Sequence, residues 1–152
     1  MQSVKKASLS DLDALAPLFD AYRVFYGKYS YIASSTAFIK SRLELNESII
    51  YLAFWGTKAV GFTQLYPLFS STRLQRLWLL NDLFVASEYR QKGLASLLIE
   101  KAQLLSQETD ASGLLLETEK SNLPANQLYP QLGFERDDQH HYYFWETPTA
   151  LL

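Results

Sequence analysis

The stretch that decides the fold is EYRQKGLASLL, residues 88–98. A hydrophobic run at residues 77–85 precedes it and is long enough to form a strand. After it, leucines recur at helical spacing up to about residue 109, namely Leu94, Leu97, Leu98, Leu104 and Leu105. The stretch therefore places two basic residues and a glycine where a strand is expected to lead into a helix.

A turn of this kind can bind an anion. The first N–H groups of a helix lack internal partners and carry a partial positive charge. Gly93 has no Cβ, so a ligand can approach the backbone closely, and Arg90 and Lys92 add positive charge. The stretch predicts a phosphate or pyrophosphate site, and the alternative on these residues alone is a basic surface turn. It is neither a P-loop nor a dinucleotide fingerprint, because GxxxxGK[ST] and GxGxxG are both absent.

The composition is that of a globular protein. A length of 152 residues suits one domain, residues 1–152, and no repeat or linker marks a boundary. The formal net charge of -2 gives no basic field for nucleic acid. The chain has no cysteine and only two histidines, so we expect no thiolate nucleophile and no metal. No run is long enough to span a membrane and no signal core is visible, so a cytoplasmic location is expected.

Periodicity predicts an α/β protein with helices on both faces of one sheet. Three leucines in a row, at residues 114–116, indicate a fully buried strand. After an N-terminal strand, we expect further strands at 48–55, 59–66, 76–85, 113–117, 134–137 and 141–146. Helices are expected at 10–27, 34–46, 93–109 and 124–132, and a loop at 67–75.

A second motif follows, LETEKSNLPANQLYPQLGF at residues 116–134. Glu117 closes the predicted strand, Asn122 lies in the loop after it, and Tyr129 lies on the next helix. Together with the strand, turn and helix around residues 88–98, this arrangement resembles the GNAT superfamily of acetyl-CoA-dependent N-acyltransferases. The resemblance covers most of the chain.

The resemblance implies a fold and a cofactor site. The fold would be a mixed, mostly antiparallel sheet of about seven strands, splayed to leave a slot for acetyl-CoA. Asn122 would contact the cofactor arm, although the Leu123-Pro124 that follows it is less usual in the family. The pantetheine arm would lie along Leu83, Phe84 and Val85, and the pyrophosphate on the loop formed by Arg90, Gln91, Lys92, Gly93, Leu94, Ala95 and Ser96.

The implied reaction needs a base, because an amine attacks a thioester only when neutral. A primary ammonium with a pKa near ~10.4 is neutral in roughly one molecule in a few thousand at pH 7. Glu117 is the first candidate base, Asp82 the second and Glu119 the third. The alternatives are a solvent-facing carboxylate for Glu117 and an internal hydrogen bond or a cation anchor for Asp82.

Tyr129 matches the family's general acid, which would protonate the departing thiolate, and the alternative is core packing. Direct transfer to a primary amine is expected, without a covalent enzyme intermediate.

Tyrosines predict where the acceptor binds. Tyr26 lies in AYRVFYGKYSYI, residues 21–32, and Tyr66 lies in GFTQLYPLFSS, residues 61–71. With Asp82, these rings would suit a cationic amine, although at least half of the tyrosines in these stretches should only pack on the sheet. The stretches are similar to a GNAT branch that includes yeast-type enzymes acetylating histone tails, polyamines and D-amino acids.

The sequence leaves two alternative functions and also suggests an oligomeric state. The chain could be an acyl-CoA-binding module without turnover, or an acetyltransferase acting on aminoacyl-tRNA, which the acidic balance disfavours. A homodimer is a further expectation, because the aromatic residues 142–145 could pair or pack across subunits, unless they pack within their own sheet.

Overall fold

The computed structural model describes residues 1–149. The chain divides into two compact units, residues 1–119 and the part from residue 120 onward, and each is described by itself. The first unit holds a five-stranded sheet in the order β1-β2-β3-β4-β5. Strands β1 to β4 pair antiparallel with their neighbours, and β5 pairs parallel with β4. The strands are β1 (Gln2–Lys6), β2 (Ile49–Trp55), β3 (Lys58–Ser70), β4 (Gln75–Val85) and β5 (Leu114–Leu115).

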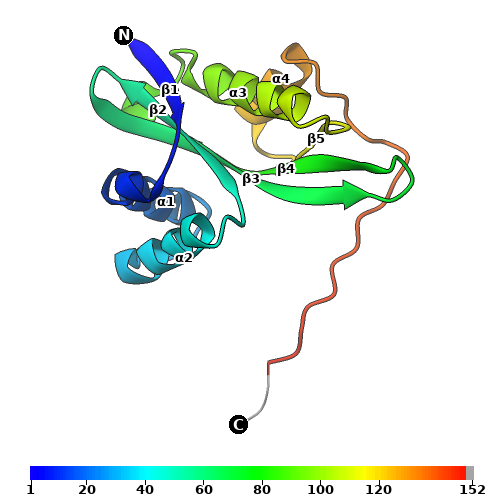
Figure 1. Cartoon of the computed structure of the whole chain (residues 1–152), viewed down its shortest axis with the longest axis horizontal. Coiled ribbons are helices and arrows are strands. Elements are labelled where there is room, and N and C mark those ends of the chain that lie inside the picture. Colours follow the sequence, from blue (N-terminus) through cyan, green and yellow to red (C-terminus); the bar gives the residue numbers. More distant parts are fainter. Residues whose placement is uncertain (150–152) are drawn as a thin grey trace. The chain divides into compact units, whose positions relative to one another are not determined.

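Helices cover both faces of this sheet (Figure 1). Helices α1 (Leu12–Phe25) and α2 (Ile32–Glu44) lie on one face, and α3 (Leu94–Glu108) lies on the other. Short 3-10 turns, η1 (Leu9–Asp11) and η2 (Ser87–Tyr89), precede α1 and α3. The predicted α/β class, with a mixed and mostly antiparallel sheet between helices, is confirmed.

Apolar side chains join α1 to the sheet. Leu15 and Phe19 from α1 pack with Phe62 from β3 and Phe84 from β4, and all four are buried. Burying one such side chain contributes about 1.5–3 kcal/mol. This cluster fixes the distance between α1 and β4, and the candidate site lies along the same interface.

A β-bulge interrupts β4 beside this cluster. Gln64 of β3 is paired with Asp82, but the next residue of β3, Leu65, is paired with Leu80, so Asn81 is the extra residue. A bulge re-aims side chains, and Asn81 and Asp82 consequently line the same pocket although they are consecutive. Strict alternation along a strand would have sent them to opposite faces.

The predicted seven strands are wrong in number. No helix or strand occurs from residue 134 to 149, where strands were expected at 134–137 and 141–146. Hydrogen bonds in this segment are local, such as those from the backbone N–H groups of Gln139 and His140 to Asp137. A run of aromatic residues favours a strand, but a strand also needs a neighbour for its backbone groups, and this segment has none in the described structure.

The strand at residues 113–117 is shorter and more exposed than predicted. Only Leu114 and Leu115 pair with β4, and Leu115 is 37% exposed. The leucine run is therefore a short edge strand rather than a fully buried one. Farther back, residues 67–70, predicted as loop, extend β3.

Within residues 120–149, the second unit contains one helix, α4 (Leu123–Gln131). The Asn122 side chain caps it by accepting a hydrogen bond from the Ala125 N–H at 3.4 Å. Gly133 follows the helix with φ of +88°, a conformation that favours glycine. The Tyr129 ring lies 5.6 Å from that of Phe134, centroid to centroid.

Candidate active site

The site begins with the turn that joins β4 to α3. Gly93 is the N-cap of α3 and has φ of +82°, and Gln91 has φ of +59°. Both lie in the left-handed region, which glycine adopts without strain. Two left-handed residues so close together turn the backbone sharply into the first turn of the helix.

This turn presents a row of backbone N–H groups. Within residues 1–149, none of the N–H groups from Gln91 to Ser96 donates a hydrogen bond, and the first that does is Leu97, to the Gly93 carbonyl at 3.1 Å. A Cβ placed on Gly93 would meet no protein atom within 4 Å, so the space in front of the turn is open. Successive N–H groups at a helix N-terminus form an anion-binding concavity. The turn therefore fits a pyrophosphate by its backbone.

The Arg90 side chain and the Lys92 carbonyl both help to hold the turn in place. The Arg90 Nε donates to the Val85 carbonyl at 2.8 Å, and its guanidinium lies 5.1 Å from the Phe25 ring centroid. Arg90 thus fastens the turn to the end of β4. The Lys92 carbonyl accepts a hydrogen bond from the Gln2 side chain at 2.6 Å.

One edge of β4 carries no strand over its last residues. β5 pairs with β4 only at Trp78 and Leu79, whereas β4 continues to Val85. In the described part of the chain, residues 80–85 thus have no strand partner on this side. An extended ligand can hydrogen-bond to such an edge as an added strand would. The residues predicted for the pantetheine arm, Leu83, Phe84 and Val85, lie on this edge, directly before the turn.

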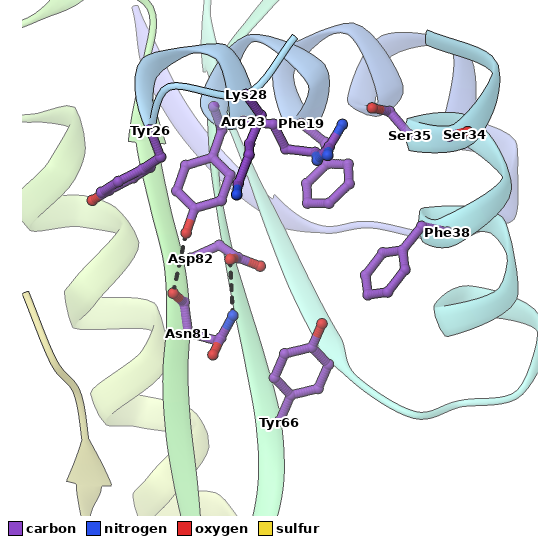
Figure 2. A pocket seen from close by; sticks show the side chains of 11 residues that line it. Phe19, Arg23, Tyr26, Lys28, Ser34, Ser35, Phe38, Tyr66, Asn81 and Asp82 are labelled. Atoms are coloured by element: carbon purple, nitrogen blue, oxygen red, sulfur yellow. Dashed lines mark hydrogen bonds between the residues drawn. The ribbon is translucent and has the colours of Figure 1, made fainter. Parts of the chain in front are cut away.

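A cavity of about 410 Å³ lies between the sheet and the helices α1 and α2, and residues of β3 and β4 form its sheet side (Figure 2). It brings together the three residues predicted to bind the acceptor, Tyr26, Tyr66 and Asp82. Its volume lies in the range of small-molecule sites. The remaining lining residues are Phe19, Tyr22, Arg23, Lys28, Ser34, Ser35, Phe38 and Asn81.

Asp82 is the buried acid of this cavity, with 3% of its surface exposed. Gln64 Nε2 donates to its Oδ2 at 2.5 Å, and Asn81 Nδ2 donates to its Oδ1 at 3.0 Å. Burial raises the pKa of Asp82 above its ordinary value, and hydrogen bonds from Gln64, Tyr22 and Asn81 oppose this shift only in part. The geometry supplies a carboxylate that takes up a proton more readily than an exposed one.

The tyrosines around Asp82 keep their protons. Burial, with the nearby Asp82 charge as a smaller cause, raises the pKa of Tyr66 to about 12. Burial likewise raises the pKa of Tyr22 and Tyr26. All three hydroxyls are hydrogen-bond donors at neutral pH, and Tyr22 donates to the Asn81 carbonyl at 3.4 Å.

A second buried carboxylate, Asp20, shapes the cavity wall from behind. It accepts hydrogen bonds from Ser30 Oγ at 2.5 Å, Ser35 Oγ at 2.7 Å and the Tyr31 N–H at 2.9 Å. Hydrogen bonds from Ser30 and Ser35 hold the pKa of Asp20 below its usual value. Asp20 thereby ties the segment between α1 and α2 to α1, and the sequence alone did not single it out.

The remaining predicted residues are two further candidate bases, the cofactor-arm residue Asn122 and the predicted acid Tyr129. Glu117 follows β5 and is exposed. Glu119 is also exposed, and its charge contributes to the raised pKa of Tyr26. Asn122 and Tyr129 belong to the second unit, where Asn122 caps α4 and Tyr129 lies on that helix.

Several lining residues were not predicted as site residues, among them Arg23, Lys28 and Asn81. Arg23 and Lys28 lie at and just after the end of α1, and Asn81 precedes Asp82 in β4. The only available signal was the polar pair Asn81-Asp82 inside the hydrophobic run at 77–85, which is unusual for a buried strand.

Two other kinds of feature are absent from the described residues. No helix within residues 1–149 is long and apolar enough to cross a bilayer. Over the same range, no group of three or more His, Cys, Asp or Glu side chains could hold a metal ion.

Comparisons with known proteins show which family this chain belongs to. A sequence model of the Acetyltransferase (GNAT) family matches residues 15–134. An uncharacterized N-acetyltransferase of Bacillus subtilis (strain 168), YhfO, is 41% identical over 97% of this chain and 99% of its own length. A probable acetyltransferase of Haemophilus influenzae is 37% identical over 74% of this chain and 77% of its own.

A solved structure is similar throughout. The crystal structure of a probable acetyltransferase superposes with a TM-score of 0.91 at 40% identity, covering 97% of this chain and 99% of that one. The chain belongs to the acetyltransferase (GNAT) family, as the sequence motifs predicted. It is thus an acyltransferase of the N-acetyltransferase type.

Proposed function

We propose that this protein transfers the acetyl group of acetyl-CoA directly to the nitrogen of a primary amine. The observation that carries the proposal is the order of features along one strand, turn and helix. Asp82 faces a pocket, residues 83–85 offer an unpaired strand edge, and residues 91–96 offer unpaired N–H groups. These three features suit an amine, an extended amide-containing arm and a pyrophosphate, respectively.

Acetyl-CoA would be held mainly by the backbone. The pyrophosphate would accept hydrogen bonds from the N–H groups of residues 91–96, and the pantetheine amides would pair with the edge at residues 83–85. We further propose, from the family motif alone, that Asn122 contacts the cofactor arm in addition to capping α4.

We assign the proton acceptor to Asp82 in preference to Glu117. Both are carboxylates, but Asp82 is buried and has a raised pKa, whereas Glu117 is exposed. A base works best when its pKa approaches the working pH, which favours the buried group. Glu117 remains the second candidate, acting through a water molecule.

The proposed chemistry is a single displacement. Asp82 takes a proton from the ammonium group, and the neutral nitrogen attacks the thioester carbonyl carbon. A C–N bond forms, the C–S bond breaks, and the thiolate of CoA leaves. Tyr129, assigned from the family motif, donates the proton that converts this thiolate to the thiol. The nitrogen loses its second proton as the amide forms, and that proton restores Tyr129. The products are an amide, free CoA and the proton that Asp82 took up, which passes to solvent.

The extent of the domain, its location in the cell and its assembly are further parts of the proposal. The family match runs from residue 15 to 134 and so includes parts of both compact units, which supports one catalytic domain over residues 1–152. We also propose a cytoplasmic enzyme that forms a homodimer and needs neither metal nor nucleic acid.

A charge placed in the turn tests the cofactor site. Ser96 is the third residue of α3, where a glutamate favours the helix by its dipole but would repel a pyrophosphate. We expect Ser96→Glu to weaken acetyl-CoA binding about tenfold or more by calorimetry, with an unchanged or higher melting temperature. Gln107→Glu adds the same charge near the other end of α3 and should bind normally. Normal binding by folded Ser96→Glu would remove the turn from the site.

A further inference from the structure

The acceptor cavity contains charges of both signs at separate places. Asp82 lies on β4, while Arg23 comes from the last turn of α1 and Lys28 from the segment just after it. Figure 2 shows Arg23 and Lys28 together on the helix side of the cavity and Tyr66 on the sheet side. An acceptor lying in this cavity would meet a carboxylate on the strand side and two cations on the helix side.

Neither cation is neutralised by an ion pair. Within residues 1–149, no carboxylate lies within 4.0 Å of the side-chain nitrogens of Arg23 or Lys28. Asp20 is near enough to feel the charge of Arg23, but its oxygens are taken by Ser30, Ser35 and the Tyr31 N–H. The two cations therefore retain hydrogen-bonding capacity for a ligand.

The backbone holds these cations in place. Gly27, two residues after the end of α1, has φ of +82°, and the Lys28 N–H donates to the Arg23 carbonyl at 3.0 Å. Lys28 is thus brought back beside Arg23 rather than carried away along the chain. Asp20 secures the following segment through Ser30 and Tyr31.

We propose that the acceptor is a small free amino acid, whose ammonium group lies at Asp82 and whose carboxylate lies at Arg23 and Lys28. This inference rests on the proposed N-acetyltransferase function and adds the substrate class. Apolar rings of Phe19 and Phe38, stacked 5.6 Å apart, offer a wall for an apolar side chain. Polyamines are disfavoured, because their additional positive charges would face two unpaired cations.

Matched acceptors test the proposal. The common L-amino acids would be assayed beside their carboxamides and spermidine, with acetyl-CoA and detection of released thiol. We expect the best amino acid to exceed its carboxamide in kcat/KM by about tenfold or more, because the carboxamide lacks the charge that Arg23 and Lys28 would bind. Equal or better use of the carboxamide or of spermidine would overturn the proposal while leaving acetyl transfer intact.

Variants assign the effect to the two cations. Arg23→Gln combined with Lys28→Gln should raise KM for the amino acid about tenfold or more, with kcat retained, and should leave the carboxamide within about twofold. Arg73→Gln removes an exposed charge from the turn between β3 and β4 and should change neither value. A double variant with wild-type KM for the amino acid would contradict the assignment.

A binding measurement separates this inference from the proposed function. If no acceptor yields thiol, the proposed function fails. Calorimetric titration of the amino acids into the protein with CoA then decides the inference. Binding by the wild type that the double variant loses would uphold the amino acid site, and absent or equal binding would overturn it.

Discussion

Gln64 Nε2 donates a hydrogen bond of 2.5 Å to Asp82 Oδ2, and both side chains are buried. Gln64 Oε1 in turn accepts from Ser48 Oγ at 2.8 Å, so three buried polar groups from β3, β4 and the residue before β2 form one chain. The chain fixes the Asp82 carboxylate at the cavity wall. A buried acid held in this way can serve catalysis at some cost in stability.

The pH dependence of turnover should follow Asp82. A base acts when ionised, and the raised pKa of Asp82 places the acid limb of kcat/KM at a higher pH than an ordinary aspartate would. We expect Asp82→Asn to lower turnover about 10²- to 10⁴-fold at neutral pH and to recover with rising pH as the amine deprotonates in solution. A variant that keeps kcat and raises only KM would make Asp82 a binding residue.

Asp82→Asn should also stabilise the fold at neutral pH. A carboxyl whose pKa is raised by folding contributes stability that is present below the unfolded pKa and lost as pH rises through the folded one. The melting temperature of the variant should therefore exceed that of the wild type at pH 7, and the difference should shrink in acid. Gln64 can turn its amide to suit the carboxamide that replaces the Asp82 carboxylate, because Ser48 Oγ can donate or accept. If the variant were less stable than the wild type at every pH, the ionised Asp82 carboxylate would not destabilise the fold.

Asp20 should behave in the opposite way. Its pKa is lowered, so its contribution to stability is present above the unfolded pKa and is lost as pH falls through the folded one. Asp20→Asn weakens three hydrogen bonds to a buried charge and should lower the free energy of unfolding by about 2 kcal/mol or more at pH 7. Denaturant unfolding measures this, with exposed Asp13→Asn as the control. Equal losses in the two variants would remove Asp20 as an anchor.

Tyr129→Phe tests the acid. The change keeps the ring and its contact with Phe134 but removes the hydroxyl. Positioned acid catalysis contributes about 10²- to 10⁴-fold, so turnover should fall by an amount in that range while acetyl-CoA affinity stays nearly constant. Steady-state kinetics and calorimetry on the same preparation separate the two. Full activity would assign Tyr129 to packing.

The segment at residues 142–145 tests assembly. Tyr142, Tyr143, Phe144 and Trp145 are between 71% and 92% exposed in the single chain. Exposed aromatic patches of this kind often mark interfaces, so we expect a dimer in analytical ultracentrifugation. Replacing Tyr143 and Phe144 together by serine should shift it to monomer, whereas Phe69→Ser, an exposed ring elsewhere, should not. A monomeric wild type would reject the homodimer.

The sequence predicted well what local pattern determines. The turn at residues 88–98, its glycine and the following helix follow from chain-local signals, as do most element boundaries. The same holds for α4, with Asn122 before it and Gly133 after it. The turn was therefore predicted before any geometry was known, and its binding of a cofactor stays a prediction.

What the sequence missed depends on tertiary placement. The bulge at Asn81 lets two consecutive side chains, Asn81 and Asp82, line the same pocket, and no local sequence pattern predicts it. Arg23 and Lys28 became site residues only when α1 packed over β4. The ranking of Glu117 over Asp82 was made without knowledge of burial, which only the fold supplies, and it stays untested. The last two predicted strands assumed neighbours that pattern alone cannot supply.

The balance of products tests the central claim most directly. The protein would be incubated with acetyl-CoA and its best amine, and free thiol and acetylated amine would be counted by colorimetry and mass spectrometry. Direct N-acetyl transfer predicts equal amounts of both, no thiol without the amine, and no acetyl group left on the protein. Thiol release without an acetylated amine, or a lasting acetyl-protein adduct, would contradict it.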